Sequence, residues 1–199
     1  MDLPVELAAN FNVDLLVGLG NPGFEYELTR HNFGFLLLDG FVKSKGVVWE
    51  QDVRSKSLVS EVTMCGRKIH CLKPQTFMNL SGDAVQRFCA YYKIKPSQVL
   101  VVCDDISISW GHFKISTIPG SAGHNGIKDI AAKIGGGFAR YRVGLGTKPK
   151  EMSLNHFVLS AFTPEEREQL PTIVETFKNN IEVIIDKGVI KGLNFIERK

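Results

Sequence analysis

The chain has 199 residues, enough for one domain that buries a hydrophobic core of its own. Hydrophobic residues make up 44% of the chain and charged residues 23%, a composition typical of globular proteins that argues against a disordered chain. The formal net charge of +3 is compatible with a polyanionic partner but does not require one.

Membrane insertion and export are not indicated by the sequence. No apolar run approaches the roughly 20 residues that a membrane-spanning helix needs. The opening segment, MDLPVELAAN, lacks the basic stretch and apolar stretch of a secretory signal, so we expect a cytoplasmic protein. The four cysteines form no CxxC pair and the five histidines are scattered along the chain, so we predict no metal site.

The first half of the chain alternates strands and helices. Residues 1–13 are predicted to be an amino-terminal extension, and 14–199 a single domain. The expected elements are a buried strand at 14–20, a helix from His31 to Gly46, a hairpin of 57–64 and 68–74, a helix at 79–94 stopped by Pro96, and a buried strand at 98–105.

The second half continues this alternation. We expect a short strand at 112–116, a glycine-rich loop at 118–126, a helix at 127–137, a strand at 139–146, and a helix running from Thr163 to about Gly188. In the strand at 139–146, Arg140 and Arg142 should face away from Tyr141. The whole pattern predicts an α/β fold: a single domain with a mixed, twisted β-sheet flanked by helices.

One motif suggests a dinucleotide site. Residues 18–23 read Gly-Leu-Gly-Asn-Pro-Gly, which fits GxGxxG after a strand. A dinucleotide fold needs the third glycine inside an opening helix, whose free amides hold the pyrophosphate. Here Pro22 and the residues after Gly23 favour a turn, with the helix beginning only near His31. We therefore set the oxidoreductase interpretation aside.

Four segments in order resemble the bacterial-type peptidyl-tRNA hydrolase family. They are GLGNPGFEYELTRHNFGFLLLD at 18–39, KPQTFMNLSG at 73–82, VVCDD at 101–105 and AGHNGIKDI at 122–130. The segments RYRVGLG and HFVLSAF also look similar, so the resemblance covers most of residues 14–162. It implies hydrolysis of the ester between the peptide and tRNA in peptidyl-tRNA, without a cofactor.

The residue types suit this chemistry. A well-oriented water and a general base can suffice for an ester, and an imidazole titrates near working pH, so His31 is the natural base. The resemblance gives His31 the same role. It also implies that Asp104 orients the imidazole, although the sequence alone does not separate Asp104 from its neighbour Asp105. A lone histidine ahead of a helix is more often a cap or a surface group.

Further site residues are implied by the same resemblance. Asn21 would engage the peptide carbonyl and so favour blocked over free aminoacyl-tRNA. The other matching positions would hold water, substrate and the tRNA terminus or form the pocket wall, and they are Asn79, Asn125, Tyr26, Phe77 and Met78. Considered singly, Asn21 and Asn125 are typical of turns, Asn79 of a helix cap, and Phe77 and Met78 of a core.

Contacts to tRNA phosphate are implied for Lys114 and Arg142. A basic patch could extend to Arg140, Lys148 and Lys150, or these three could simply form a solvated strand face. The chain departs from the family pattern at Ser107, Ser109, Ser116 and Ala122, of which Ser116 stands where a second basic residue is common.

Peptidyl-tRNA is therefore the expected partner, and we expect a monomer without a membrane or an obligate protein partner. The alternative is a non-catalytic RNA-binding protein on the same fold. A pure RNA binder has no need of a general base, so the complete set of His31, Asp104 and three asparagines favours the enzyme.

Overall fold

The computed structural model describes residues 11–196. Most of the predicted extension, residues 1–10, lies outside that range. Phe11 and Val13, which are described, are buried in the hydrophobic core. Residues 11–13 thus pack with the domain, while the predicted boundary at residue 13 stays a prediction. None of the helices between residues 11 and 196 combines the length and apolar character needed to cross a membrane.

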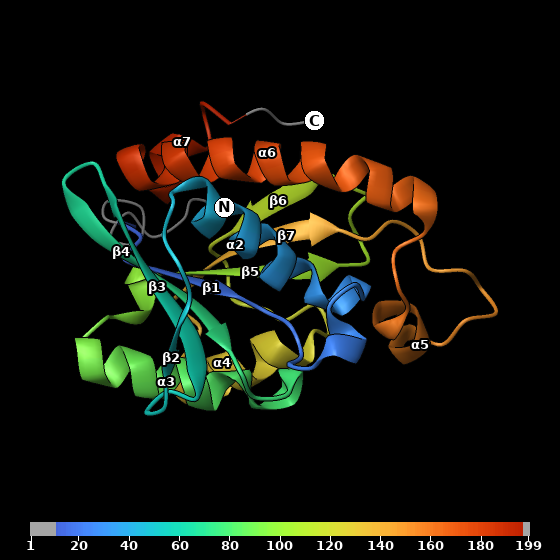
Figure 1. Cartoon of the computed structure of the whole chain (residues 1–199), viewed down its shortest axis with the longest axis horizontal. Helices are drawn as coiled ribbons and strands as arrows, with labels where there is room; N and C mark the ends of the chain where they lie inside the picture. Colours follow the sequence, from blue (N-terminus) through green and yellow to red (C-terminus); the bar gives the residue numbers. More distant parts are fainter. Residues whose placement is uncertain (1–10, 197–199) are drawn as a thin grey trace.

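A seven-stranded mixed sheet forms the centre of the molecule (Figure 1). Its strands, in spatial order, are β2 (Glu50–Asp52), β3 (Ser57–Met64), β4 (Arg67–Pro74), β1 (Leu15–Gly18), β5 (Val99–Asp105), β7 (Ala139–Gly144) and β6 (Phe113–Ser116). The four strands β4, β1, β5 and β7 are mutually parallel, and the outer pairs are antiparallel. The predicted mixed sheet and the hairpin of β3 and β4 are confirmed.

Helices cover both faces of the sheet. The helices α2 (Phe33–Ser44) and α6 (Pro164–Lys187) lie on one face, and α3 (Ser81–Tyr92) and α4 (Asn125–Ile134) on the other (Figure 1). Each face has its own cluster of buried apolar side chains, with Phe41 and Phe177 in the first and Val85 and Ile127 in the second. Burial from both sides explains why β1 and β5 are continuous apolar runs rather than alternating ones.

The ends of α6 follow the local signals in the sequence. The Thr163 hydroxyl accepts a hydrogen bond from the Glu166 amide, and the Glu166 carboxylate accepts one from the Thr163 amide. This capping box starts the helix, and Gly188 with a positive φ ends it, as predicted.

Several short elements escape the sequence prediction. They are β2, α5 (Leu154–Leu159), α7 (Val189–Gly192) and the 3-10 turns η1 (Phe24–Tyr26), η2 (Arg30–Asn32), η3 (Met78–Leu80) and η4 (Pro96–Gln98). The helix predicted at 79–94 also ends earlier, because Lys93 adopts a left-handed conformation before Pro96 is reached.

Glycines let α2 approach the ends of the central strands closely. A Cβ atom on Gly18 would lie 2.7 Å from the carbonyl oxygen of Gly34, and one on Gly34 would lie 2.4 Å from that of Val102. Gly18, the first glycine of the motif that imitates a dinucleotide site, therefore serves helix–strand packing, and so does Gly34 in α2. The α-helix after β1 begins only at Phe33, and His31 in the preceding turn η2 lies beside the carboxyl end of β5.

Candidate active site

Three elements meet at the carboxyl end of the sheet, where open α/β sheets commonly bind ligands. The turn η2 carries His31, the last residues of β5 are Asp104 and Asp105, and His124 is the N-cap residue of α4. Chain topology thus brings together groups from three distant parts of the sequence.

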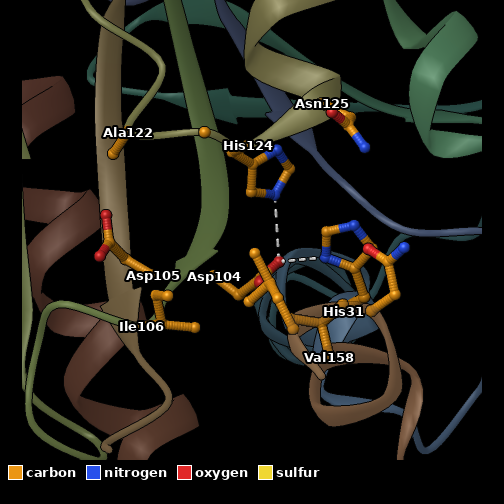
Figure 2. A pocket seen from close by; sticks show the side chains of 11 residues that line it. His31, Asp104, Asp105, Ile106, Ala122, His124, Asn125 and Val158 are labelled. Carbon is orange, nitrogen blue, oxygen red and sulfur yellow. Dashed lines mark hydrogen bonds and ion pairs between the residues drawn. The ribbon is translucent and has the colours of Figure 1, made fainter. Parts of the chain in front are cut away.

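Asp104 is the centre of this site (Figure 2). Its Oδ1 atom lies 2.9 Å from Nδ1 of His31 and 3.1 Å from Nε2 of His124. The Asp104 side chain is only 3% exposed, against 12% for His31 and 8% for His124. One carboxylate oxygen therefore accepts two imidazole hydrogen bonds in a site largely shielded from water.

The electrostatics keep Asp104 charged. Burial opposes ionisation, yet the two histidines together hold the pKa of Asp104 well below its ordinary value. Burial likewise disfavours a charged imidazole, but the charge of Asp104 and its hydrogen bond outweigh this and raise the pKa of His31. With Nδ1–H donated to Asp104, the free Nε2 of His31 is the atom available to take a proton.

His124 is a residue that sequence reasoning missed. Its Nδ1 accepts a hydrogen bond from the Ile127 amide at the start of α4, so its proton sits on Nε2 and points at Asp104. The available signal was its place beside Asn125 in the GHN segment. The potential ligand atoms of His31, Asp104 and His124 lie within 4.8 Å of one another, a donor set that transition metals accept. In the described arrangement these atoms satisfy each other through hydrogen bonds.

A pocket opens beside His31. One wall is apolar and comes from α5 and from the residue after β5, and the opposite wall is the loop leading into α4 (Figure 2). Its lining residues are His31, Asp104, Asp105, Ile106, Ala122, Gly123, His124, Asn125, Leu154, Asn155 and Val158. The predicted residues His31, Asp104 and Asn125 therefore share one cavity.

Asn21 is fixed next to the His31 turn. Its backbone amide donates to the side chain of Asn32 at 2.8 Å, and the Asn32 amide group donates back to the Asn21 carbonyl at 2.9 Å. The Asn21 Oδ1 atom accepts from the Met78 amide at 2.8 Å, which leaves the Nδ2 hydrogens as donors. Asn21 lines a neighbouring depression rather than the pocket of His31. Met78 itself is buried in the core.

The remaining predicted substrate contacts lie at the surface. Asn79 is exposed and does not cap α3, whose N-cap residue is Leu80. The Tyr26 and Phe77 rings meet edge to face with centroids 6.4 Å apart, and Phe77 is 55% exposed. Tyr26 is half-buried, and the exposed Phe77 ring offers a face on which a nucleobase can stack.

The basic residues are arranged differently from the expected patch. Arg142 lies next to Lys114 in the pairing of β6 and β7, but its guanidinium binds the Asp105 carboxylate at 2.6 Å. Ser116 and Ser107, two of the departures from the family pattern, also accept hydrogen bonds from Arg142. Burial disfavours ionisation of Asp105, but bonds from Ser107 and Arg142 lower its pKa. The charge of Arg142 is therefore largely cancelled within the protein, while Lys114 is exposed.

The three basic residues that could extend the patch also differ in their surroundings. Arg140 faces the same side as Arg142, as predicted, and lines the same depression on the sheet edge. It is 6% exposed and its Nε has no hydrogen-bond partner in the described range, so burial lowers its pKa. Lys148 bonds to backbone carbonyls of its own loop, and Lys150 is exposed.

The sequence and fold match one protein family. The model of the family described as peptidyl-tRNA hydrolase matches residues 15–199. The chain belongs to the peptidyl-tRNA hydrolase family. A family member from Gloeobacter violaceus is 39% identical over 181 residues, covering 90% of this chain and 91% of its own. One from Chloroflexus aurantiacus is 40% identical over 183 residues, covering 90% of this chain and 96% of its own.

A solved structure of the family shares the fold of this chain. The peptidyl-tRNA hydrolase from Acinetobacter baumannii superposes with a TM-score of 0.87 at 30% identity, covering 93% of this chain and 94% of its own. A chloroplastic family member from Arabidopsis thaliana is 37% identical over 187 residues, covering 93% of this chain and 65% of its own. The family therefore includes an organellar member, and the cytoplasmic location expected here stays a prediction.

Proposed function

We propose that this protein hydrolyses the ester bond between the peptide and tRNA in peptidyl-tRNA, with His31 as general base and Asp104 as its orienting partner. The observation that carries the proposal is the bond from His31 Nδ1 to a buried, ionised Asp104 at 2.9 Å. This bond leaves Nε2 of His31 free and stabilises the imidazolium that forms when it accepts a proton.

The reaction balances without a covalent intermediate on the protein. Nε2 of His31 takes a proton from water as the water oxygen bonds to the ester carbonyl carbon. The tetrahedral intermediate collapses by breaking the bond from that carbon to the ribose oxygen. The imidazolium returns its proton to the ribose oxygen, which gives tRNA with a free hydroxyl and a peptide with a free carboxyl group.

The asparagines supply neutral hydrogen-bonding groups around this reaction. Asn21 retains only its Nδ2 donors, which suits a bond to a peptide carbonyl oxygen. Such a bond would favour blocked substrates, which present that carbonyl, over free aminoacyl-tRNA. Asn125, in the pocket of His31, is placed to contact water or the ester, and exposed Asn79 to contact the tRNA terminus.

On the tRNA side, Lys114 is the better candidate for a phosphate contact, because Arg142 is engaged by Asp105. The exposed Phe77 ring, packed against half-buried Tyr26, would receive the 3′ end. The protein would act as a monomer in the compartment where translation takes place.

The direct test is hydrolysis of an N-acetylated aminoacyl-tRNA by purified protein, beside the free aminoacyl-tRNA and the His31→Ala variant. We expect rapid release from the blocked substrate and a loss of kcat of about 10³-fold in the variant, with tRNA binding retained. Tight tRNA binding without turnover would instead identify a non-catalytic RNA-binding protein. Wild-type turnover by His31→Ala would remove His31 from its role.

A further inference from the structure

Arg30, the residue before His31, is a buried cation that the reaction itself does not use. The residue is 6% exposed, and its guanidinium binds the Glu166 carboxylate at 2.6 Å. The same group donates to the Ser160 hydroxyl at 2.7 Å and to the Ala161 carbonyl at 2.6 Å. Ser160 and Ala161 belong to the segment that links α5 to α6, and Glu166 lies in the first turn of α6.

The backbone reinforces the same connection. The Arg30 amide donates to the Ser160 carbonyl at 3.1 Å, and the Phe162 amide donates to the Leu28 carbonyl at 3.1 Å. Thr29 and Ala161 form an isolated antiparallel bridge. The residues just before His31 and the end of α5 are thus joined by main-chain and side-chain bonds together.

An arginine suits this place better than a lysine. Its planar fork reaches a carboxylate, a hydroxyl and a carbonyl at once, while its face covers the Phe157 ring at 4.9 Å from the centroid. The Nε atom is nevertheless buried and has no hydrogen-bond partner among residues 11–196. A buried charge with an unsatisfied donor costs stability, so the arrangement calls for a gain elsewhere.

The Arg30 contacts bear on the pocket beside His31. Helix α5 contributes Leu154, Asn155 and Val158 to the pocket wall, and its carboxyl end is the part that Arg30 holds. Glu166, the partner of Arg30, also caps α6 by accepting from the Thr163 amide at 2.7 Å. Arg30, the first residue of the turn that carries His31, therefore binds the residues that directly follow α5, the helix that forms one wall of the pocket.

We propose that Arg30 is a positioning residue that holds the α5 wall at a fixed distance from His31 and so sets the affinity of the pocket for substrate. The proposal rests on the function proposed above. His31 itself is oriented by Asp104, and its turn by the reciprocal bonds of Asn21 and Asn32, none of which involves Arg30. Loss of the Arg30 contacts should therefore loosen the wall and leave the base in place.

The test compares KM with kcat. In Arg30→Gln we expect KM for an N-acetylated aminoacyl-tRNA to rise about tenfold, while kcat stays within about twofold of the wild type. Glu166→Gln retains an oxygen for the α6 cap and should raise KM by a smaller factor. Arg30→Lys keeps the charge without the fork and should fall between Arg30→Gln and the wild type.

Arg67→Gln is the matched control. Arg67 is also a partly buried arginine. It donates to the Val13 carbonyl at 2.8 Å and pairs with Asp14, so it ties β4 to the residues just before β1, away from the pocket. It should lower the melting temperature and leave KM unchanged. An unchanged KM in Arg30→Gln, or an equal rise in Arg67→Gln, would overturn the positioning role.

Amide hydrogen exchange separates this idea from the proposed function. Residues 153–161 should exchange faster in Arg30→Gln than in the wild type, and not in Arg67→Gln, whether or not the protein turns over. If the wild-type protein were inactive, the proposed function would be wrong, while the exchange result would still decide the role of Arg30. If residues 153–161 exchanged at the same rate in Arg30→Gln and in the wild type, the role of Arg30 would be wrong, and the proposed function would be unaffected.

Discussion

Asp104 and Asp105 are consecutive carboxylates at the end of β5, yet their surroundings differ in kind. Successive side chains of a strand point in opposite directions, and Asp104 points at His31 and His124 while Asp105 turns away from them (Figure 2). Asp105 instead binds Arg142 at 2.6 Å. Two identical groups one residue apart thus enter two separate networks.

The difference lies in what each charge is paired with. Around Asp104 the partners are titratable imidazoles, so its negative charge raises the pKa of His31 and remains available to stabilise an imidazolium. Around Asp105 the partner is a permanent cation, and the two charges largely cancel. In the proposed mechanism, Asp104 supports proton transfer, while Asp105 offsets the charge of Arg142, one of the residues predicted to contact tRNA phosphate.

Substitution of each aspartate by asparagine tests this difference most strongly. In Asp104→Asn we expect kcat to fall about 10²- to 10³-fold, because the imidazolium loses its counter-charge. The pKa of His31 should also fall, since only the charge of Asp104 and its bond hold it up against burial. The rising limb of the kcat–pH profile should then move to lower pH.

Asp105→Asn is the control for that experiment. It makes the same chemical change one residue away, and kcat together with its pH profile should match the wild type. If both variants lost kcat equally, the assignment of the two carboxylates to separate networks would be wrong.

His124 allows a second test, with a smaller effect and the opposite pH shift. His124→Asn keeps a side chain able to cap α4 but removes the Nε2 donor from Asp104. We expect kcat to fall about tenfold through the loss of one bond to a charged group. With one donor fewer, the Asp104 charge acts more strongly on His31, so the rising limb should move to higher pH. A shift to lower pH, as in Asp104→Asn, would contradict this.

Much of the fold could be predicted because its signals are local. The apolar runs of β1 and β5 and the Thr163 capping box of α6 each lie within a few consecutive residues. The missed elements lack such signals. Strand β2 is three polar residues, and α5 is six residues long, too short to show a helical period.

The site was less accessible to sequence reasoning, because its contacts depend on the tertiary structure. The role predicted for His31 came from the chemistry of an imidazole and from the family resemblance, and it stays a prediction. The convergence of His124 on Asp104 requires α4 to begin beside the end of β5. The choice between Asp104 and Asp105 depends on which way the last residues of β5 point. The neutralisation of Arg142 depends on the register of β5 and β7, which pairs Arg142 with Cys103. No local pattern encodes that register.

The smallest expected effect concerns the network of Asp105 and Arg142. Ser116 accepts a hydrogen bond from Arg142 at 3.2 Å and stands in register with Arg140 on β7. Ser116→Lys would add a cation that Asp105 does not cancel, on the strand that also carries Lys114. We expect KM to fall about threefold at low salt, and the salt dependence of binding to gain about one released counterion.

Ser116→Gln, a neutral side chain of similar reach, is the control for this change and should leave the salt dependence unaltered. In Ser116→Lys, kcat should not change, because the added charge is outside the His31 network, and the melting temperature should fall because the new cation lies near Arg140 and Arg142. An unaltered KM with a lowered melting temperature would mean that this side of the sheet does not meet the tRNA backbone. A lowered KM in the lysine variant alone would show that the absence of a cation at position 116 weakens phosphate binding at this edge of the sheet.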